Sequence, residues 1–414
     1  MPSLNRRGML ASVGSAALAA AAVPVQAATG QLGTGPIKEG EGADIVGLSN
    51  PARQAEEPFT IAPPQTDHGT MPNMKWSFTD SHMRLEEGGW ARQTTIRELP
   101  VSKAMAGVNM RLKTDVAREM HWHKEAEWSY VLKGRARITA VDPDGRTFVD
   151  DVGEGDLWYF PGGTPHSIQG LASDVDGVEF LLVFDDGAFS EDSTFLITDW
   201  LAHVPRDVLA KNFGVREDAL AHLPTRERYI FPAAAPAPFA QERTHGAGPV
   251  LQSFSHRMLA QQPQVMPGGT IRITDSRNFP ASRTIAAALV ELQPGAMREL
   301  HWHPTGDEWQ FYIEGQGRMG VFGSEGKART FDYQGGDVGY VPFAMGHYIE
   351  NTGSTPLRFL EMFRSDRFAD LSLNQWVKLT PPELVRSHLN IDQALLDNLS
   401  AEKTLVLPGK PQPA

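Results

Sequence analysis

The hydrophobic positions of this chain fall in short runs rather than in long helical stripes. Between residues 76 and 184 the runs have the length of strands and are separated by Gly, Pro and Asp, as in Trp128–Leu132, Ala136–Val141 and Leu157–Phe160. A tight hairpin turn is indicated by Asp142–Gly145, because Asp, Pro and Gly adopt the backbone angles that such turns require. Strand-length runs bounded by turn residues about every 8–12 positions favour an all-β fold, an antiparallel barrel or sandwich.

The same pattern occurs twice along the chain. From about Ser253 onward, segments of the first half return in the same order. The matched pairs are Gly134–Val141 with Gly315–Val321, Phe148–Phe160 with Phe331–Val341, and Phe180–Phe184 with Phe359–Phe363. A separation of about 180 residues between matched segments indicates a duplicated domain rather than a repeat array. We therefore expect two tandem β-barrels, a division that suits 414 residues.

The segments around the barrels differ from them in composition. Residues 29–75 are rich in Gly, Pro and polar residues and predict an extended N-terminal arm. The first domain is expected to span 76–230 and to close with a helical segment from Asp199. The Pro- and Ala-rich stretch 231–250 predicts a semi-rigid linker, and the second domain, with helices at its C-terminal end, is expected over 251–414.

The first 28 residues have the pattern of an export signal. Arg6 and Arg7 precede an Ala-rich apolar run to about Val25 and a small-residue cleavage region at Gln26–Ala28. The paired arginines resemble a twin-arginine signal, with a Sec signal as the alternative. An uncleaved membrane anchor is disfavoured because the run is mostly Ala, and no other run is long and apolar enough to span a bilayer. We expect a periplasmic or secreted protein with no stable membrane anchor.

Charge and cysteine content exclude several kinds of partner and chemistry. The formal net charge of −12 argues against binding to nucleic acid or to an anionic membrane, because both require a basic surface. A small anionic substrate is compatible with this charge, since one buried Arg can set the local field. The chain contains no Cys, which excludes disulfides and thiol nucleophiles.

The candidate chemistry is concentrated around a His-Trp-His motif that occurs in both halves. The expected metal ligands are His121, His123, Glu127 and His166 in the first half, and His301, His303, Glu308 and His347 in the second. Alternate residues of a strand share a face, so the two His residues of each motif point the same way. The Glu follows the second His by four residues in one copy and by five in the other, and a one-residue change within a strand would reverse its face. A turn between the His pair and the Glu is therefore required in both copies.

Chance is a poor explanation for these histidines. Six of the 13 His residues fall at the repeated spacing, whereas others, such as His68, His82, His203 and His388, have no partner pattern and are expected to be surface or core residues. Three imidazoles and one carboxylate suit Fe, Mn, Zn or Cu, and intrinsic affinity favours Cu or Zn over Mn. Because the twin-arginine route exports folded protein, we hypothesise that a weakly competing metal is inserted before export. Exported protein that contained only Zn or Cu would contradict this.

These residues resemble the motifs of the cupin family. The second half matches the first cupin motif fully, with Gly295, His301, His303, Glu308 and Gly315. In the first half Asp115 stands where the motif has Gly, and in the second motif of the second half Ala344 replaces a Gly.

The pair of halves is similar to the bicupins of the oxalate decarboxylase family over nearly all of the chain after the arm. The resemblance implies two Mn ions per chain, O2 as a co-catalyst and conversion of oxalate to formate and CO2. It also implies a homo-oligomer, a trimer or a hexamer.

The two halves differ where the first has three extra residues. Phe184 to Trp200 takes 16 steps, whereas Phe363 to Trp376 takes 13. The excess lies near residues 189–194, which resemble the mobile lid of the decarboxylases. The resemblance implies that Glu191 is the lid carboxyl, and Asp192 replaces the family's Asn and adds a charge beside it. A surface turn of small polar residues is the structural alternative.

The resemblance also implies roles for residues around the metals. Glu191 would donate the proton that completes formate, and without it the fragment left after CO2 loss would be oxidised fully, with H2O2 formed. Arg118 would hold the oxalate carboxylate beside the first metal, and a plain surface Arg is the alternative. Arg298 repeats this placement as a second substrate-binding candidate. Glu361, at the position of Leu182, is either an alternative proton donor or a structural partner of Arg298, and we favour the structural role.

Together these observations predict an exported bicupin with Mn in both sites that decarboxylates oxalate at the first. Oxalate oxidase is the rival within the same class of enzyme, and the Glu in the lid argues against it. A non-catalytic bicupin of the storage or binding type is the rival outside that class. The complete ligand sets in both halves argue against it.

Overall fold

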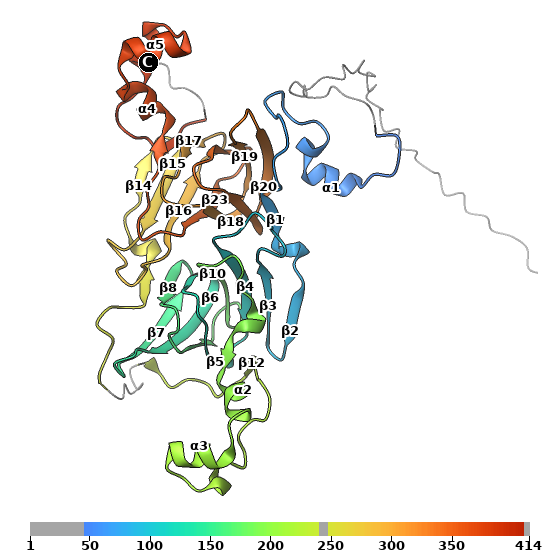
Figure 1. The fold of residues 1–414 in the computed structure, drawn as a ribbon, viewed down its shortest axis with the longest axis vertical. Helices are drawn as coiled ribbons and strands as arrows, with labels where there is room; N and C mark the ends of the chain where they lie inside the picture. The colour runs from blue at the N-terminus through green and yellow to red at the C-terminus, as the bar shows by residue number, and fades with distance from the viewer. Residues whose placement is uncertain (1–44, 240–246, 410–414) are drawn as a thin grey trace, which may run out of the picture.

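The computed structural model describes residues 45–239 and 247–409. These residues form two antiparallel β-barrels that are stacked along the long axis of the molecule, with short helices at both ends (Figure 1). The predicted all-β class, two tandem barrels each followed by short helices, is confirmed. The export signal predicted at 1–28 lies outside the described residues.

The first barrel is built from one sheet that folds over itself. Its strand order is β11-β5-β9-β6-β10-β4-β3-β2, with β12 paired to β5 and with β7 and β8 paired to β6. The strands of this barrel are β2 (Met83–Glu86), β3 (Gly89–Thr94), β4 (Ala106–Leu112), β5 (Val116–Trp122), β6 (Glu127–Val141), β7 (Thr147–Gly153), β8 (Asp156–Phe160), β9 (His166–Gly170), β10 (Val178–Phe184), β11 (Phe195–Leu196) and β12 (Ile230–Pro232).

The second barrel has two sheets. One has the order β1-β21-β18-β23-β16-β15-β14, and the other has the order β20-β19-β22-β17-β24, with β25 on β17. The strands that follow the linker are β13 (Ser255–Arg257), β14 (Gln264–Met266), β15 (Gly269–Thr274), β16 (Ala286–Leu292), β17 (Met297–Trp302), β18 (Glu308–Glu314), β19 (Gln316–Phe322), β20 (Ala328–Gln334), β21 (Asp337–Val341), β22 (Gly346–Asn351), β23 (Leu357–Phe363), β24 (Leu371–Ser372) and β25 (Val406–Leu407).

One glycine in each barrel lies where the chain bends and changes the strands that it pairs with. The long strand β6 passes through Gly134, and its counterpart is divided into β18 and β19 at Gly315. Their φ angles are 80° and 89°, in the region that favours glycine. A Cβ at Gly134 would lie 2.0 Å from the Gly177 carbonyl oxygen, and one at Gly315 would lie 2.6 Å from that of Pro356. The Gly that ends the His-rich motif in each half, Gly134 or Gly315, cannot be replaced by a residue with a Cβ without a clash.

The two barrels exchange strands. β1 (Lys75–Ser77) precedes the first barrel in sequence but pairs with β21 of the second, and β13 pairs with β8 of the first. The segment expected to be an extended arm thus ends in the second barrel, where Met71 and Met74 are buried in the core. The main core cluster contains residues of both barrels, including Phe78 and Phe311, whose ring centres are 5.9 Å apart.

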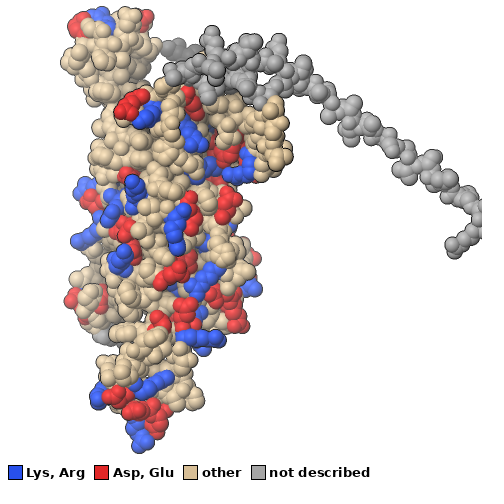
Figure 2. Space-filling view, turned by 45° about the vertical axis from the view of Figure 1, so that its right-hand side comes forward, with Lys and Arg blue, Asp and Glu red and all other residues tan. Residues whose placement is uncertain are grey.

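Short helices border the barrels. The α-helices are α1 (Pro51–Glu56), α2 (Ile197–Ala202), α3 (Arg206–Phe213), α4 (Leu373–Leu379), α5 (Pro382–Leu389) and α6 (Gln393–Asn398). The 3-10 helices are η1 (Pro58–Thr60), η2 (Phe78–Asp80), η3 (Glu191–Ser193), η4 (Glu217–Leu220) and η6 (Met258–Ala260). Among the described residues, no helix has the length and apolarity needed to cross a membrane. On the face shown in Figure 2, basic and acidic side chains are interspersed rather than gathered in one basic patch.

Candidate metal centres and active site

The four candidate ligands of the first site come from neighbouring strands. His121 lies on β5, His123 lies just after this strand ends, and Glu127 and His166 are the first residues of β6 and β9. His121 and His166 are direct partners in the pairing of β5 with β9. The structure thus brings together residues that are up to 45 positions apart in the sequence.

The second site repeats this arrangement. His301 on β17 is the cross-strand partner of His347 on β22, and Glu308 is the first residue of β18. Because a turn precedes the Glu in both copies, spacings of four and five residues bring the carboxylate to the same place.

The candidate ligand atoms are close enough to share one ion. In each site they all lie within 4.8 Å of one another, and all four residues are buried. Oε2 of Glu127 lies 3.2 Å from Nε2 of His123 and 3.3 Å from Nε2 of His166. In the second site, the corresponding distances from Oε2 of Glu308 are 2.9 and 2.8 Å. Burying this many polar groups is costly unless they are paired or coordinate a cation.

A backbone carbonyl orients every ligand imidazole. Nδ1 donates a hydrogen bond of 2.6–3.0 Å in each case, from His121 to Glu119, His123 to Glu125, His166 to Thr164, His301 to Glu299, His303 to Ala369 and His347 to Met345. A proton on Nδ1 leaves the Nε2 lone pair free to bind a metal. Nε2 of His166 is buried and makes no hydrogen bond, so a metal ion would satisfy it. The donor set therefore fits a divalent first-row metal, Mn included.

The protonation states agree with metal binding. Burial lowers the pKa of His121 well below its usual value, and the cationic Arg118 lowers it further. The pKa of His301 is lowered in the same way. Burial acts to raise the pKa of Glu127, but the facing imidazole of His166 opposes it and the pKa lies below its usual range. Neutral imidazoles and an ionised carboxylate are the forms that bind metals.

Arg118 reaches the first site because β5 is irregular. A residue three positions before His121 would point to the opposite face of a regular strand. The register of β5 with β9 shifts between Arg118 and His121, and such a bulge re-aims side chains. Arg118 is 3% exposed and lines a small cavity together with the ligands His121, His123 and Glu127.

The guanidinium of Arg118 is free of carboxylate partners. Nη1 donates to the Tyr229 carbonyl at 3.3 Å, and the group lies 4.0 Å from the centre of the Tyr229 ring. Among the described residues, Arg118 makes no ion pair with a carboxylate, although the carboxyls of Glu191 and Glu127 lie near enough to act on its pKa. Burial lowers the pKa of Arg118 to about 10, so the side chain remains a cation at neutral pH. It is available to bind an anion in the cavity.

Glu191 separates this cavity from the surface. It is the first residue of η3 and lines the cavity that also contains Arg118. It also lines an outer pocket that contains Arg84 and Arg97. Its carboxyl is hydrogen-bonded to the hydroxyl of Tyr229. Glu191 therefore stands between the metal ligands and the outer pocket.

Burial raises the pKa of Glu191 to about 7. The cations of Arg118 and Arg84 act in the opposite direction, and the neighbouring Asp192 raises the pKa further. A carboxyl that titrates near neutral pH is suited to donate and accept a proton.

Comparison with known proteins finds similarity over both halves of the chain. The cupin family matches residues 78–219 and 256–395. Oxalate decarboxylase OxdC of Bacillus subtilis is 55% identical over 376 residues, which cover 91% of this chain and 97% of that protein. The chain belongs to the oxalate decarboxylase family of cupins. A probable oxalate decarboxylase of Arthroderma benhamiae is 41% identical over 400 residues, 95% of this chain and 97% of that protein.

Solved structures of the family agree with this fold. The structure of the Bacillus subtilis oxalate decarboxylase at pH 4.6 has a TM-score of 0.87 at 55% identity and covers 91% of this chain and 98% of its own. Another structure of the same protein, also with a TM-score of 0.87, concerns its Mn(II) centres. The predicted membership of the bicupin oxalate decarboxylase family is confirmed. The described part of the chain contains two groups of three His and one Glu, the number expected for two Mn ions.

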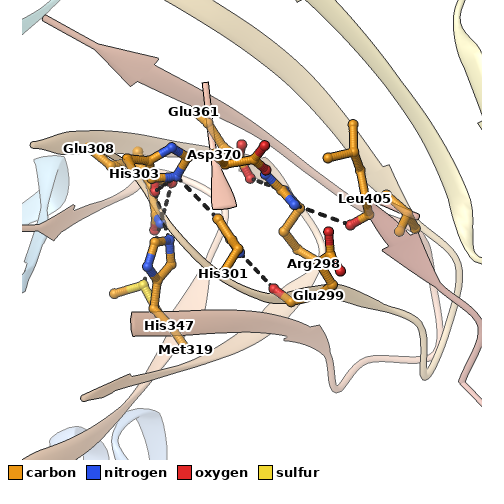
Figure 3. Close-up of polar contacts among 12 residues, drawn as sticks. Arg298, Glu299, His301, His303, Glu308, Met319, His347, Glu361, Asp370 and Leu405 are labelled. Carbon is orange, nitrogen blue, oxygen red and sulfur yellow. Dashed lines mark hydrogen bonds and ion pairs between the residues drawn. The ribbon is translucent and has the colours of Figure 1, made fainter. Parts of the chain in front are cut away.

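Arg298, the counterpart of Arg118 in the second barrel, is ion-paired with two carboxylates (Figure 3). Arg298 is fully buried, and its Nε donates to Oε1 of Glu361 at 3.2 Å. Its Nη2 is ion-paired with Asp370, which also binds Lys403. Its Nη1 donates to the Leu405 carbonyl at 3.4 Å. Arg298 is held by the protein and is not free for an anion, in contrast to Arg118.

Two substitutions between the barrels account for this contrast. Phe184 pairs with Glu127 and Phe363 pairs with Glu308, so Leu182 and Glu361 occupy equivalent positions. The alignment of β11 with β24 likewise places Thr194 at the position of Asp370. Neither carboxylate that holds Arg298 therefore has a counterpart beside Arg118. Burial acts to raise the pKa of Glu361, and the cation of Arg298 acts in the opposite direction.

Sequence reasoning did not identify Tyr229, Asp370 or Glu119. Tyr229 follows the helical extension of the first barrel and returns to the site only because β12 pairs with β5. The apolar residues Ile230 and Phe231 before the Pro-rich segment could have indicated an edge strand, but no sequence pattern shows which strand it would join.

Proposed function

We propose that this chain converts oxalate to formate and CO2, with Mn in both sites, O2 as co-catalyst and the active site in the first barrel. The observation that carries the proposal is Glu191, a partly buried carboxyl with a pKa of about 7 over the cavity that contains Arg118. The oxalate substrate is supported by relatives that are named oxalate decarboxylases and align over nearly the whole chain.

The residues of the first site match the requirements of the reaction. Oxalate dianion and one proton yield CO2 and formate: the C–C bond breaks, CO2 leaves, and the electron pair left on the other carbon forms its C–H bond. Mn, when bound by His121, His123, Glu127 and His166, would supply one-electron chemistry with O2 that weakens the C–C bond. Arg118 would hold a substrate carboxylate and stabilise charge, and Glu191 would hold the proton that reaches carbon.

Oxalate oxidation is the competing outcome at the same site. In that reaction oxalate, O2 and two protons yield two CO2 and H2O2, so no proton is delivered to carbon. A protonated carboxyl that lies over the cavity favours decarboxylation, because it can deliver a proton to carbon. Arg118 makes no ion pair among the described residues, whereas Arg298 pairs with both Glu361 and Asp370, and this contrast favours the first barrel as the active one.

The test is the product of purified, Mn-loaded protein in air-saturated buffer with oxalate. We expect formate and CO2 in equal amounts. H2O2 with negligible formate would establish an oxidase instead, and the absence of any product would contradict an enzymatic role.

We also propose that the protein is exported as a folded, metal-loaded chain by the twin-arginine route, as supported by Arg6, Arg7 and the apolar run after them. Replacing both arginines with Lys should retain the precursor in the cytoplasm. Unimpaired export of that variant would indicate the Sec route.

A homo-oligomer, a trimer or a hexamer, is proposed on the family resemblance. Light scattering of the purified protein tests this proposal, and a monomeric mass would contradict it.

A further inference from the structure

One buried carboxylate of the first barrel is bonded to both chain segments that border the active-site cavity. Glu119 lies on β5 and is 2% exposed. Its Oε1 accepts hydrogen bonds from the backbone N–H of Thr198 at 2.8 Å and from the Thr198 hydroxyl at 2.5 Å. Its Oε2 accepts from the backbone N–H groups of Arg228 and Tyr229, both at 2.8 Å. All four bonds are donated to a single side chain from segments that are distant in the sequence.

The first of these segments anchors the end of the lid. Thr198 lies in the first turn of α2, four residues after Thr194, which lines the cavity. The N-cap position of α2 makes no side-chain hydrogen bond to the helix. An anion at the N-terminal turn of a helix is favoured because free N–H groups point toward it. Glu119 therefore supplies the fixed point at which the lid joins the barrel.

The second segment places Tyr229. Its φ of 53° lies in the left-handed region, where a side chain of this size is strained. The Glu119 carboxylate accepts hydrogen bonds from the N–H groups of Arg228 and Tyr229, and the Glu119 N–H donates to the Tyr229 carbonyl at 2.9 Å. These bonds hold the strained backbone in place. The same Tyr229 presents its hydroxyl to Glu191 and its carbonyl to Arg118.

The second barrel provides a matched comparison. Glu299 occupies the same place on β17, and its N–H donates to the Leu405 carbonyl at 3.1 Å, as that of Glu119 does to Tyr229. Its side chain, however, accepts only from the Ser372 hydroxyl at 2.6 Å, and Oε1 is buried with no hydrogen bond. The fourfold bonding occurs in the barrel that has the three-residue extension.

We propose that Glu119 is a positioning residue that holds the lid, residues 189–194, in its place over the cavity. By fixing Thr198 and the Arg228–Tyr229 turn, it places the Tyr229 hydroxyl where it orients the carboxyl of Glu191. It thereby acts on the choice between formate and H2O2 without contact with the substrate. This inference rests on the proposed decarboxylase function.

The test is the Glu119→Gln variant of the full chain, with Mn content measured beside formate and H2O2. An amide has one acceptor oxygen, so its NH2 group must face two of the four donors, and a buried donor left unpaired is costly. We expect Mn content close to that of the unsubstituted protein and a fall of about tenfold or more in the ratio of formate to H2O2. Glu299→Gln is the matched control and should leave the ratio unchanged.

A milder variant keeps the proposal testable if Glu119→Gln fails to fold. Thr198→Val removes only the hydroxyl bond to Glu119 and should lower the product ratio in the same direction by a smaller factor. An unchanged ratio, a proportional loss of both products, or an equal effect of Glu299→Gln would overturn the proposal. If the unsubstituted protein makes no formate, the proposed function fails instead, whatever the variants do.

Discussion

Tyr229 places its hydroxyl against the carboxyl of Glu191, although 38 residues separate the two. The guanidinium groups of Arg84 and Arg118 lie over the Tyr229 ring, 3.5 and 4.0 Å from its centre. One aromatic residue thus connects the lid, the free arginine and the outer pocket. Its counterpart in the second barrel is Leu405, which offers only a backbone carbonyl to its arginine. The hydrogen bond between the Tyr229 hydroxyl and the Glu191 carboxyl therefore has no counterpart at Leu405, whose side chain has no hydroxyl.

Formate production is expected to fall as the pH rises through about 7. Glu191 must be protonated to act as a donor, and burial raises its pKa to about 7. The protonated form predominates below that pH, and each further unit above it reduces the donor fraction about tenfold. The measurement is kcat for formate at saturating oxalate between about pH 5 and pH 9. A flat profile above pH 7 would contradict this assignment.

Asp192→Asn should move that decline to lower pH. The Asp192 carboxylate raises the pKa of Glu191, so its removal lowers that pKa. Asp207→Asn on α3 removes an exposed carboxylate elsewhere and serves as the control. A shift of the profile to higher pH in Asp192→Asn, or an equal shift in the control, would be inconsistent with the proposed effect.

Arg298→Met should destabilise the protein more than Arg118→Met does. Removing Arg298 leaves the buried Glu361 without its cation and Asp370 with Lys403 alone, and loss of one partner of a buried ion pair costs about 3 kcal/mol or more. Arg118 has no carboxylate partner among the described residues, so its loss should cost about 1–2 kcal/mol. Denaturant unfolding of the two Mn-loaded variants measures the difference. Equal losses would show that the ion pairs do not distinguish the two arginines.

Ala344→Gly should stabilise the second barrel. Ala344 has a φ of 62°, which strains any residue with a Cβ, and its counterpart in the first barrel is Gly163 at 78°. We expect a gain of about 0.5–1 kcal/mol, observed as a higher melting temperature. The reverse change, Gly163→Ala, places a Cβ in open space and should cost a similar amount through backbone strain alone. A neutral or destabilising Ala344→Gly would contradict this explanation.

Much of the metal chemistry could be predicted from the sequence because it depends on local spacing. His121 and His123 share a face by strand periodicity, and the differing positions of Glu127 and Glu308 are compatible only with intervening turns, which are present. The departures from the cupin motifs also have a local explanation. Asp115 adopts a φ of 57°, a conformation that Asp tolerates better than most residues.

Features that depend on distant pairing could not be predicted. Nothing in residues 71–77 shows that they join β21, which lies about 260 positions later. The inward orientation of Arg118 depends on a bulge, and three-residue spacing alone would place it on the wrong face. The state of Arg298 depends on Asp370, and the lid contact depends on Tyr229, each brought to its site by a short edge strand.

The central claim is that Glu191 of the first barrel directs the reaction to formate, and Glu191→Gln compared with Glu361→Gln tests it most directly. Both variants keep the side-chain size and are assayed with Mn, oxalate and O2 for formate and H2O2. The account predicts that Glu191→Gln loses formate production about 100-fold or more and gains H2O2, while Glu361→Gln keeps formate as its main product. Formate production that survives in Glu191→Gln and is lost in Glu361→Gln would contradict it.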